Sequence, residues 1–355
     1  SGVADEMVIG PEFEFYVFDS ARFEADEHRA SFAVDTVEGH WNSAAQNYGN
    51  GVQVPKKGGY HIDLPADSTY DLRSNICMLL EDWGVKVKYH HHEVGGCGQL
   101  EVEVELGEIV KMADSTMAAK YIIKNAARRE GRTATFMPKP LAGVAGSGMH
   151  VHMLLTKDGK PVFYDEAGYA HLSETALYFI GGLLKHAASL CALTNPSTNS
   201  FKRLVPGFEA PVTIGYAMAN RSAVVRIPSY AKSPMHKRFE LRNPDATCNP
   251  YYAYAAILMA GLDGIRERID PHANGWGPYD FNLFDLPEAE KAKIGGLPKT
   301  LDEALDALER DHEYLTRGGV FPERLIGLWI EKKRAEAAEL ARIPNPAEYV
   351  KYYDL

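Results

Sequence analysis

The sequence predicts an α+β fold in which helices flank a largely antiparallel sheet. Several segments alternate apolar and polar residues with the period of a strand, and others carry helix caps and helical periodicity. The two kinds of segment do not follow one another in simple β-α-β order, which would have favoured a parallel sheet. These observations together select the α+β class.

Strands are expected wherever short apolar runs alternate with polar residues between turn residues. The expected strands are residues 7–10 (MVIG), 13–18 (FEFYVF), 85–94 (VKVKYHHHEV), 100–106 (LEVEVEL), 149–155 (MHVHMLL) and 223–228 (AVVRIP). Asp158-Gly159, between Lys157 and Lys160, predicts a hairpin turn because both residues tolerate a positive φ.

Helices are expected between these strands. Ser115 can cap a helix that ends near Arg129, before Gly131. Thr300 and Glu303 have the spacing of a capping box. The other expected helices are residues 173–194, 251–262 and 322–341. Residues 270–299 are rich in Gly, Pro, Asn and Asp and predict one long surface loop, and residues 1–355 are expected to form one domain.

Composition excludes several classes of function. A formal net charge of −10 argues against general binding to nucleic acid or to anionic membranes. The longest apolar run, residues 251–262, is too short to span a bilayer. Four dispersed cysteines without a C-x-x-C pair suit a reducing cytosol and predict buried thiols. The first residues lack an initiator Met and resemble no signal peptide, so a fragment of a longer protein is expected.

Acidic residues gather at the ends of several expected strands. Glu12 and Glu14 share one face of their strand, as do Glu101, Glu103 and Glu105. Glu93 precedes a glycine-rich reversal, His150 and His152 share a face, and Glu240 lies between Arg238 and Arg242. Two carboxylates 4 Å apart repel by about 4 kcal/mol at an effective dielectric near 20. If the strands converge, hard cations such as Mg²⁺ or Mn²⁺ would relieve this repulsion; taken singly, each glutamate is a solvated side chain.

Arginines interrupt two apolar strand segments, at Arg226 and Arg242. A guanidinium matches carboxylate and phosphate groups in shape and charge, so a phosphorylated acid would explain both residues. The structural alternative is a buried arginine paired with a core carboxylate.

The motifs resemble the catalytic domain of bacterial type I glutamine synthetase. The matching stretches occur in family order and include GPEFEF, KGGYHIDLP, HHEVGGCGQLEVE, GSGMHVHM, NPSTNSFKRLVPGFEAP, NRSAVVRIP and KRFELRNPDATCNPYY. The resemblance implies a curved, largely antiparallel sheet like that of glutamine synthetases and guanidine kinases. It also implies a cytoplasmic, dodecameric enzyme that ligates glutamate and ammonia at the expense of ATP. From the resemblance we expect the family's N-terminal β-grasp domain to be absent from this sequence.

The resemblance also implies roles for individual residues. Glu14, Glu93 and Glu101 would ligate one Mg²⁺ or Mn²⁺ ion, and Glu12, His150 and Glu240 a second. Glutamate and ammonium would be bound by Tyr60, Glu93, Gly146, Arg203, Glu209 and Arg242. ATP would be bound by His152, Arg221, Arg226 and Arg238. Catalysis would depend on Glu209, Arg221, Arg226 and Arg242. Glu103 and Glu105 match no functional position and are expected to be solvated.

Three positions depart from the family pattern. Ala145 replaces an asparagine beside the glutamate site, Leu154 replaces a serine on the adenine side, and Phe284 replaces a tyrosine that other members adenylylate. Ala145 keeps open a γ-glutamyl amide ligase that uses an organic amine, and a non-catalytic relative is a further alternative. The intact ligand and arginine set argues against the latter.

Overall fold

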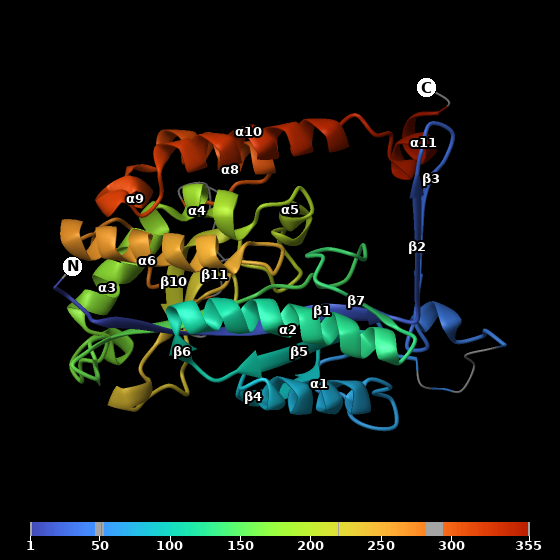
Figure 1. Cartoon of the computed structure of the whole chain (residues 1–355), viewed down its shortest axis with the longest axis horizontal. Helices are drawn as coiled ribbons and strands as arrows, with labels where there is room; N and C mark the ends of the chain where they lie inside the picture. Colours follow the sequence, from blue (N-terminus) through green and yellow to red (C-terminus); the bar gives the residue numbers. More distant parts are fainter. Residues whose placement is uncertain (1, 47–50, 52, 219, 282–293, 354–355) are drawn as a thin grey trace.

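The computed structural model describes residues 2–46, 51, 53–218, 220–281 and 294–353. Its centre is a large sheet whose main path runs β10-β11-β12-β8-β1-β5-β4. Along this path β10 and β11 are parallel and the other neighbours are antiparallel. Helices flank the sheet (Figure 1). The expected α+β class and largely antiparallel sheet are confirmed.

The strands have the following bounds: β1 Glu6–Phe18, β2 Ser20–Ala25, β3 Ala30–Asp35, β4 Val87–His92, β5 Gln99–Val104, β6 Gly107–Glu108, β7 Thr133–Thr135, β8 Val151–Lys157, β9 Lys160–Pro161, β10 Thr213–Met218, β11 Ala223–Ile227 and β12 Phe239–Leu241. The α-helices are α1 Tyr70–Asp82, α2 Ile109–Arg129, α3 Glu174–Lys185, α4 Ala187–Thr194, α5 Ser200–Arg203, α6 Pro250–Glu267, α8 Leu301–Arg310, α9 Glu313–Thr316, α10 Glu323–Leu340 and α11 Pro346–Tyr352.

β1 lies in the interior of the sheet and joins two segments that the sequence suggested separately. Its alternation sends Phe13, Phe15 and Val17 into the main apolar core, together with Ile76 of α1 and Ile123 of α2. The intervening Glu12 and Glu14 therefore point to the opposite face. One face of the sheet is thus packed against helices, and the other carries the polar residues of the site.

The helices beyond α1 and α2 pack mainly on one another. α3 lies along α6, α4 contacts α8, and α10 covers α8. α10 runs along the edge of the molecule in Figure 1. In the described part of the chain no single helix is long and apolar enough to cross a membrane, although the bent pair α3 and α4 passes on length and composition together.

Two helix predictions need correction. α2 begins at Ile109 rather than at Ser115, because the side chain of Glu108 accepts hydrogen bonds from the backbone N–H groups of Val110 and Lys111. The helix expected over 173–194 is broken at His186 into α3 and α4, which are bent by 74°. The His186 ring lies between Asp263, 3.0 Å from Nε2, and Asp311, 2.8 Å from Nδ1.

Other local predictions are confirmed. Asp158 (φ 50°) and Gly159 (φ 71°) form the hairpin turn between β8 and β9. Thr300 caps α8 by accepting a hydrogen bond from the N–H of Glu303. Three cysteines are buried and Cys77 is half-buried.

The loop expected over 270–299 is described only at its two ends. Residues 270–281 and 294–299 form no helix and pack beside β10, where Tyr279 donates its backbone N–H to Tyr216. The stretch 282–293, which includes Phe284, lies outside the described residues.

The contact of α3 with α6 gives a stability test. A Cβ on Gly264 would overlap the carbonyl oxygen of Tyr178 and the backbone of Gly182. Gly264→Ala should therefore lower the free energy of unfolding by about 1–3 kcal/mol. Gly327 in α10 has no atom near its Cβ position, so Gly327→Ala should stabilise by about 0.5–1 kcal/mol. Urea denaturation measures the free energy of unfolding of both variants. The same change in both would contradict the close packing of α3 on α6.

Candidate active site

Two pairs of glutamates face each other across β1 and β5. Glu12 is opposite Glu103, and Glu14 is opposite Glu101. All four residues are at most 8% exposed. Like charges directly opposite one another destabilise a sheet. This face of the sheet therefore requires positive charge from elsewhere.

Two histidines on the next strand supply part of it. Glu12 lies 2.7 Å from Nδ1 of His150 and 2.7 Å from Nε2 of His152. On β12, Glu240 is opposite His152 and lies 3.2 Å from its Nε2. Burial alone would raise the pKa of Glu12, but the charge of His152 and hydrogen bonds from both histidines outweigh it and hold that pKa well below its usual value.

A second carboxylate cluster has less compensation. The reversal after β4 brings Glu93 to Glu14 and Glu101, and His91 Nε2 lies 3.4 Å from Glu101. Burial, followed by the charges of Glu14 and Glu101, raises the pKa of Glu93 well above its usual value. Burial and the charges of Glu12 and Glu14 do the same for Glu101. The contact of His91 with Glu101 is longer than the two 2.7 Å contacts that histidines make with Glu12.

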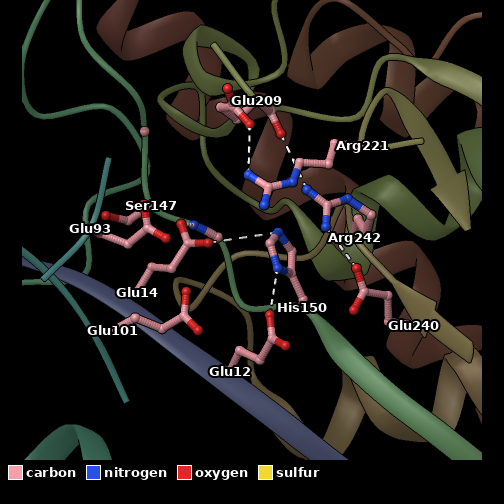
Figure 2. Close-up of polar contacts among 12 residues, drawn as sticks. Glu12, Glu14, Glu93, Glu101, Ser147, His150, Glu209, Arg221, Glu240 and Arg242 are labelled. Carbon is pink, nitrogen blue, oxygen red and sulfur yellow. Dashed lines mark hydrogen bonds and ion pairs between the residues drawn. The ribbon is translucent and has the colours of Figure 1, made fainter. Parts of the chain in front are cut away.

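Arginines lie across from the carboxylates (Figure 2). Arg242 Nη1 is 2.7 Å and Arg226 Nε 3.0 Å from Glu240. Arg221 Nη1 is 3.0 Å from Glu209. Burial raises the pKa of Glu240, but the charges of His152, Arg242 and Arg226 lower it overall. Glu240 is therefore the compensated end of the site.

A cavity of about 260 Å³ separates the two groups. Its lining comes from β1, β5 and β11 and from the loops that carry Tyr60, Glu93, Gly146 and Glu209. Glu14, Glu93 and Glu101 lie on one side, with Arg221 and Arg242 on the other (Figure 2). Such a cavity can hold a polyanion between bound cations and guanidinium groups.

Two glycines make room for Arg203 beside this cavity. A Cβ on Gly148 would overlap the guanidinium of Arg203, and one on Gly146 would overlap the carbonyl oxygen of Pro138. Gly148 also donates its N–H to Glu14, 2.6 Å away. Arg203 donates to the carbonyl oxygens of Asn243 and Arg242 at 2.7 and 3.0 Å. Its guanidinium is thus fixed at the cavity wall.

Comparison with known proteins identifies the arrangement. The family model described as "Glutamine synthetase, catalytic domain" matches residues 1–352. The chain belongs to the glutamine synthetase family. The glutamine synthetases of Streptomyces filamentosus and Streptomyces coelicolor are 48% and 49% identical to it over 356 residues, which is 100% of this chain and 75% of each relative.

Solved structures agree with this placement. The glutamine synthetase of Plasmodium falciparum has a TM-score of 0.87 at 32% identity, covering 99% of this chain and 76% of that one. A structure named GmaS in complex with ADP has a TM-score of 0.78 at 31% identity, covering 99% of this chain and 73% of that one. The family recognised from the sequence motifs is therefore confirmed.

The structure brings most of the expected site residues of this glutamine synthetase chain to one cavity. Those that line it are Glu12, Glu14, Tyr60, Glu93, Glu101, Gly146, His150, Arg203, Glu209, Arg221, Arg226 and Arg242. His152, Arg238 and Glu240 are buried behind the wall. Arg238 contacts the ring of Tyr230, 5.4 Å from its centroid, and Tyr230 itself lines the cavity.

One expectation for a neighbouring residue is wrong. Glu103 is 1% exposed rather than solvated, because it lies opposite Glu12 and pairs with Lys88 at 2.6 Å. Glu105, beyond the end of β5, is exposed as expected. His91 was not among the residues predicted from the sequence. It stands two positions before Glu93 in the HHHE run, which is the spacing of side chains on one face of a strand.

The donor set fits divalent cations. Among the described residues, three groups have ligand atoms within 4.8 Å of one another, and two of them belong to this site: Glu12, His152 and Glu240, and His91, Glu93 and Glu101. Carboxylates with at most one imidazole are ligands that Mg²⁺ and Mn²⁺ accept. The sequence predicted His150, rather than His152, as the ligand that joins Glu12 and Glu240. Both His150 and His152 contact Glu12.

Two of the departures from the family pattern, Ala145 and Leu154, lie among the described residues. Ala145 lines the cavity, and its carbonyl oxygen accepts a hydrogen bond of 2.6 Å from Tyr16. Leu154 is buried in the apolar core. The missing asparagine side chain therefore leaves the backbone of the turn in place.

The raised pKa of Glu101 predicts how pH changes stability without metal. Both Glu101 and a glutamine are neutral below the ordinary pKa of 4.5. Above it the unfolded chain ionises before the folded one, so Glu101→Gln should become more stable than the parent as pH rises. The difference grows by about 1.4 kcal/mol per pH unit up to the folded pKa.

Thermal denaturation in EDTA from pH 4 to 8 measures this difference, with exposed Glu105→Gln as the matched control. Added Mn²⁺ should stabilise the parent more than Glu101→Gln. A gap that shrinks as pH rises would contradict the burial of an uncompensated Glu101 carboxyl.

Proposed function

We propose that this protein is a glutamate–ammonia ligase that makes L-glutamine from L-glutamate, ammonia and ATP for nitrogen assimilation. The observation that carries the proposal is the cavity itself, with buried carboxylates on one side and arginines on the other. The γ-phosphoryl group passes from ATP to the side-chain carboxylate of glutamate. Ammonia then attacks γ-glutamyl phosphate and releases phosphate.

Two Mg²⁺ or Mn²⁺ ions would be held by Glu14, Glu93 and Glu101 and by Glu12, His150 and Glu240. When bound they would neutralise phosphate charge, which is the main requirement of phosphoryl transfer. His91 and His152 are further candidates for these sites because of their distances to Glu101 and Glu240.

The arginines divide the remaining charge between the two substrates. Arg221, Arg226 and Arg238 would bind ATP phosphates, with His152 behind them. Arg203, Arg242 and the backbone of Gly146 would bind glutamate. The fixed orientation of Arg203 supports a positioning role, since preorganised donors need no rearrangement when charge develops.

Glu209 would close the cavity and accept a proton from ammonium. It lies in a loop with Gly207 (φ 88°), and its own φ is 62°, an uncommon conformation for a residue other than glycine. Lys57 donates to the carbonyl oxygen of Gly207 at 3.2 Å, and Arg221 lies 5.7 Å from the ring of Tyr60. The loop is thereby linked to Tyr60, which with Glu93 would bind ammonium. Closure would protect γ-glutamyl phosphate from water.

An organic amine in place of ammonia is the second candidate. Ala145 replaces a polar residue, and Tyr60, Phe208 and Ala210 line the same cavity, so an alkyl group would meet apolar atoms. The structures named GmaS are 30–31% identical to this chain, whereas the glutamine synthetases of the two Streptomyces species are 48–49% identical. The higher identity favours ammonia.

Phosphate release from MgATP and glutamate tests the function. It should require ammonia, with little release on putrescine or methylamine. Glu209→Ala should lower kcat by about 10²–10⁴-fold, the usual loss of a general base, while exposed Glu166→Ala leaves it unchanged. Release that depends on an organic amine would select the second candidate, and no release with any amine would contradict both.

We further propose a cytoplasmic dodecamer. The hairpin of β2 and β3 stands away from the body of the molecule (Figure 1). Phe23 and Phe32 are opposite each other on it and are 84% and 67% exposed. Two large apolar side chains exposed side by side support an interface at this hairpin.

Replacing both phenylalanines by serine should reduce the assembly to smaller species, as measured by light scattering after size-exclusion chromatography. Met78→Ser, which removes a 61% exposed apolar residue from α1, is the control. An unchanged mass would exclude the hairpin from the interface.

A further inference from the structure

A buried carboxylate and imidazole lie behind the wall of the cavity, outside the set of expected site residues. Glu38 and His92 are both 0% exposed, and Glu38 Oε2 lies 3.0 Å from His92 Nε2. Glu38 follows β3, whereas His92 is the last residue of β4. The pair therefore joins segments that are far apart in the sequence.

Glu38 connects more than one loop. Its Oε1 accepts hydrogen bonds from the N–H and the hydroxyl of Ser68 at 2.9 and 2.7 Å. Its Oε2 accepts a bond of 2.8 Å from the N–H of Gly98, at the end of the reversal that carries Glu93. Each carboxylate oxygen thus has two protein donors.

Asp67, the third member of a candidate ligand group with Glu38 and His92, is equally satisfied. It accepts hydrogen bonds from Thr69 and from Arg73, with the Arg73 ion pair at 2.6 Å. A bound cation would have to displace these donors. The cluster is therefore a hydrogen-bonded network rather than a metal site.

His92 reaches the cavity wall through the backbone. Its Nδ1 lies 3.0 Å from the carbonyl oxygen of Gly59 and 3.1 Å from that of Glu93. Gly59 precedes Tyr60, and a Cβ on Gly59 would overlap the carbonyl oxygen of Glu93. The two loops that present Tyr60 and Glu93 to the cavity are thus in direct contact, and the His92 ring is bonded to both.

We propose that Glu38 and His92 form a positioning pair that sets the separation of Tyr60 and Glu93, and thereby the affinity of the Glu93 side of the cavity for a divalent cation and for ammonium. The effect on cation and ammonium affinity rests on the proposed function, whereas the effect on the separation of Tyr60 and Glu93 does not. Partners that orient metal ligands from behind change metal affinity by about 10–100-fold when removed. Glu38 and His92 act on Glu93 through its peptide group in the same way.

Mn²⁺ binding to the full chain tests the pair without any turnover, because EPR spectroscopy counts the free ion. The parent should bind two Mn²⁺ ions. In Glu38→Gln one of them should bind about 10–100-fold more weakly, and the other should be unchanged. Asp67→Asn is the matched control, because it disturbs the neighbouring Arg73 ion pair instead. It should lower Tm about as much as Glu38→Gln does, but leave both Mn²⁺ affinities unchanged.

Two substitutions of His92 separate its two contacts. The Asn amide of His92→Asn replaces Nδ1 and keeps the bond to Gly59, whereas the Gln amide of His92→Gln replaces Nε2 and keeps the bond to Glu38. His92→Asn should retain more Mn²⁺ affinity than His92→Gln, and its KM for ammonia should rise less. These variants also decide the matter if Glu38→Gln does not fold.

The outcomes distinguish this inference from the proposed function. Loss of one Mn²⁺ affinity in a chain that makes no glutamine supports the positioning pair while the ligase proposal fails. Unchanged Mn²⁺ affinity and ammonia KM in active Glu38→Gln and His92→Gln overturn the pair and leave the ligase intact. The positioning pair is also overturned if Asp67→Asn lowers the Mn²⁺ affinity as much as Glu38→Gln does. It is overturned as well if the parent binds a third Mn²⁺ ion that Glu38→Gln loses, because the cluster would then be a metal site.

Discussion

Repulsion between carboxylates on one face of the sheet is the constraint on which the rest of the site depends. The antiparallel register places Glu12 against Glu103 and Glu14 against Glu101, and all four residues are buried. Strand pairing cannot relieve this repulsion, because the same register packs Phe13 and Phe15 into the core on the other face. Compensation must come from side chains or ions on the polar face.

The protein compensates the two pairs differently. Glu12 and Glu103 have His150, His152 and Lys88 within the chain. Glu14 and Glu101 have longer contacts with positive groups: His150 Nε2 lies 3.8 Å from Glu14, and His91 Nε2 lies 3.4 Å from Glu101. Both residues of this less compensated pair line the cavity, where a cation can arrive from solvent. Stability and ligand binding are therefore governed by the same electrostatic requirement.

Sequence reasoning reached much of this from the alternation of single strands. The period of two placed Glu12 and Glu14 on one face, and the family motifs related Glu93, His150 and Glu240 to them. It could not place Glu103, because the register that buries it depends on the pairing of two strands far apart in the chain. Nor could it find the break at His186, where Asp263 and Asp311 approach from distant helices. Roles that depend on tertiary partners were out of reach.

The pairing of Lys88 with Glu103 restricts how this sequence can drift. Lys88 and Glu103 lie on neighbouring strands, and Glu103 is also opposite Glu12. Loss of the lysine alone would leave the buried Glu103 with the longer contact to His152, at 3.9 Å, and loss of the glutamate alone would leave the lysine without this counter-ion. The two positions can change together far more easily than one at a time. The charge at one of these positions therefore limits which side chains the other can carry.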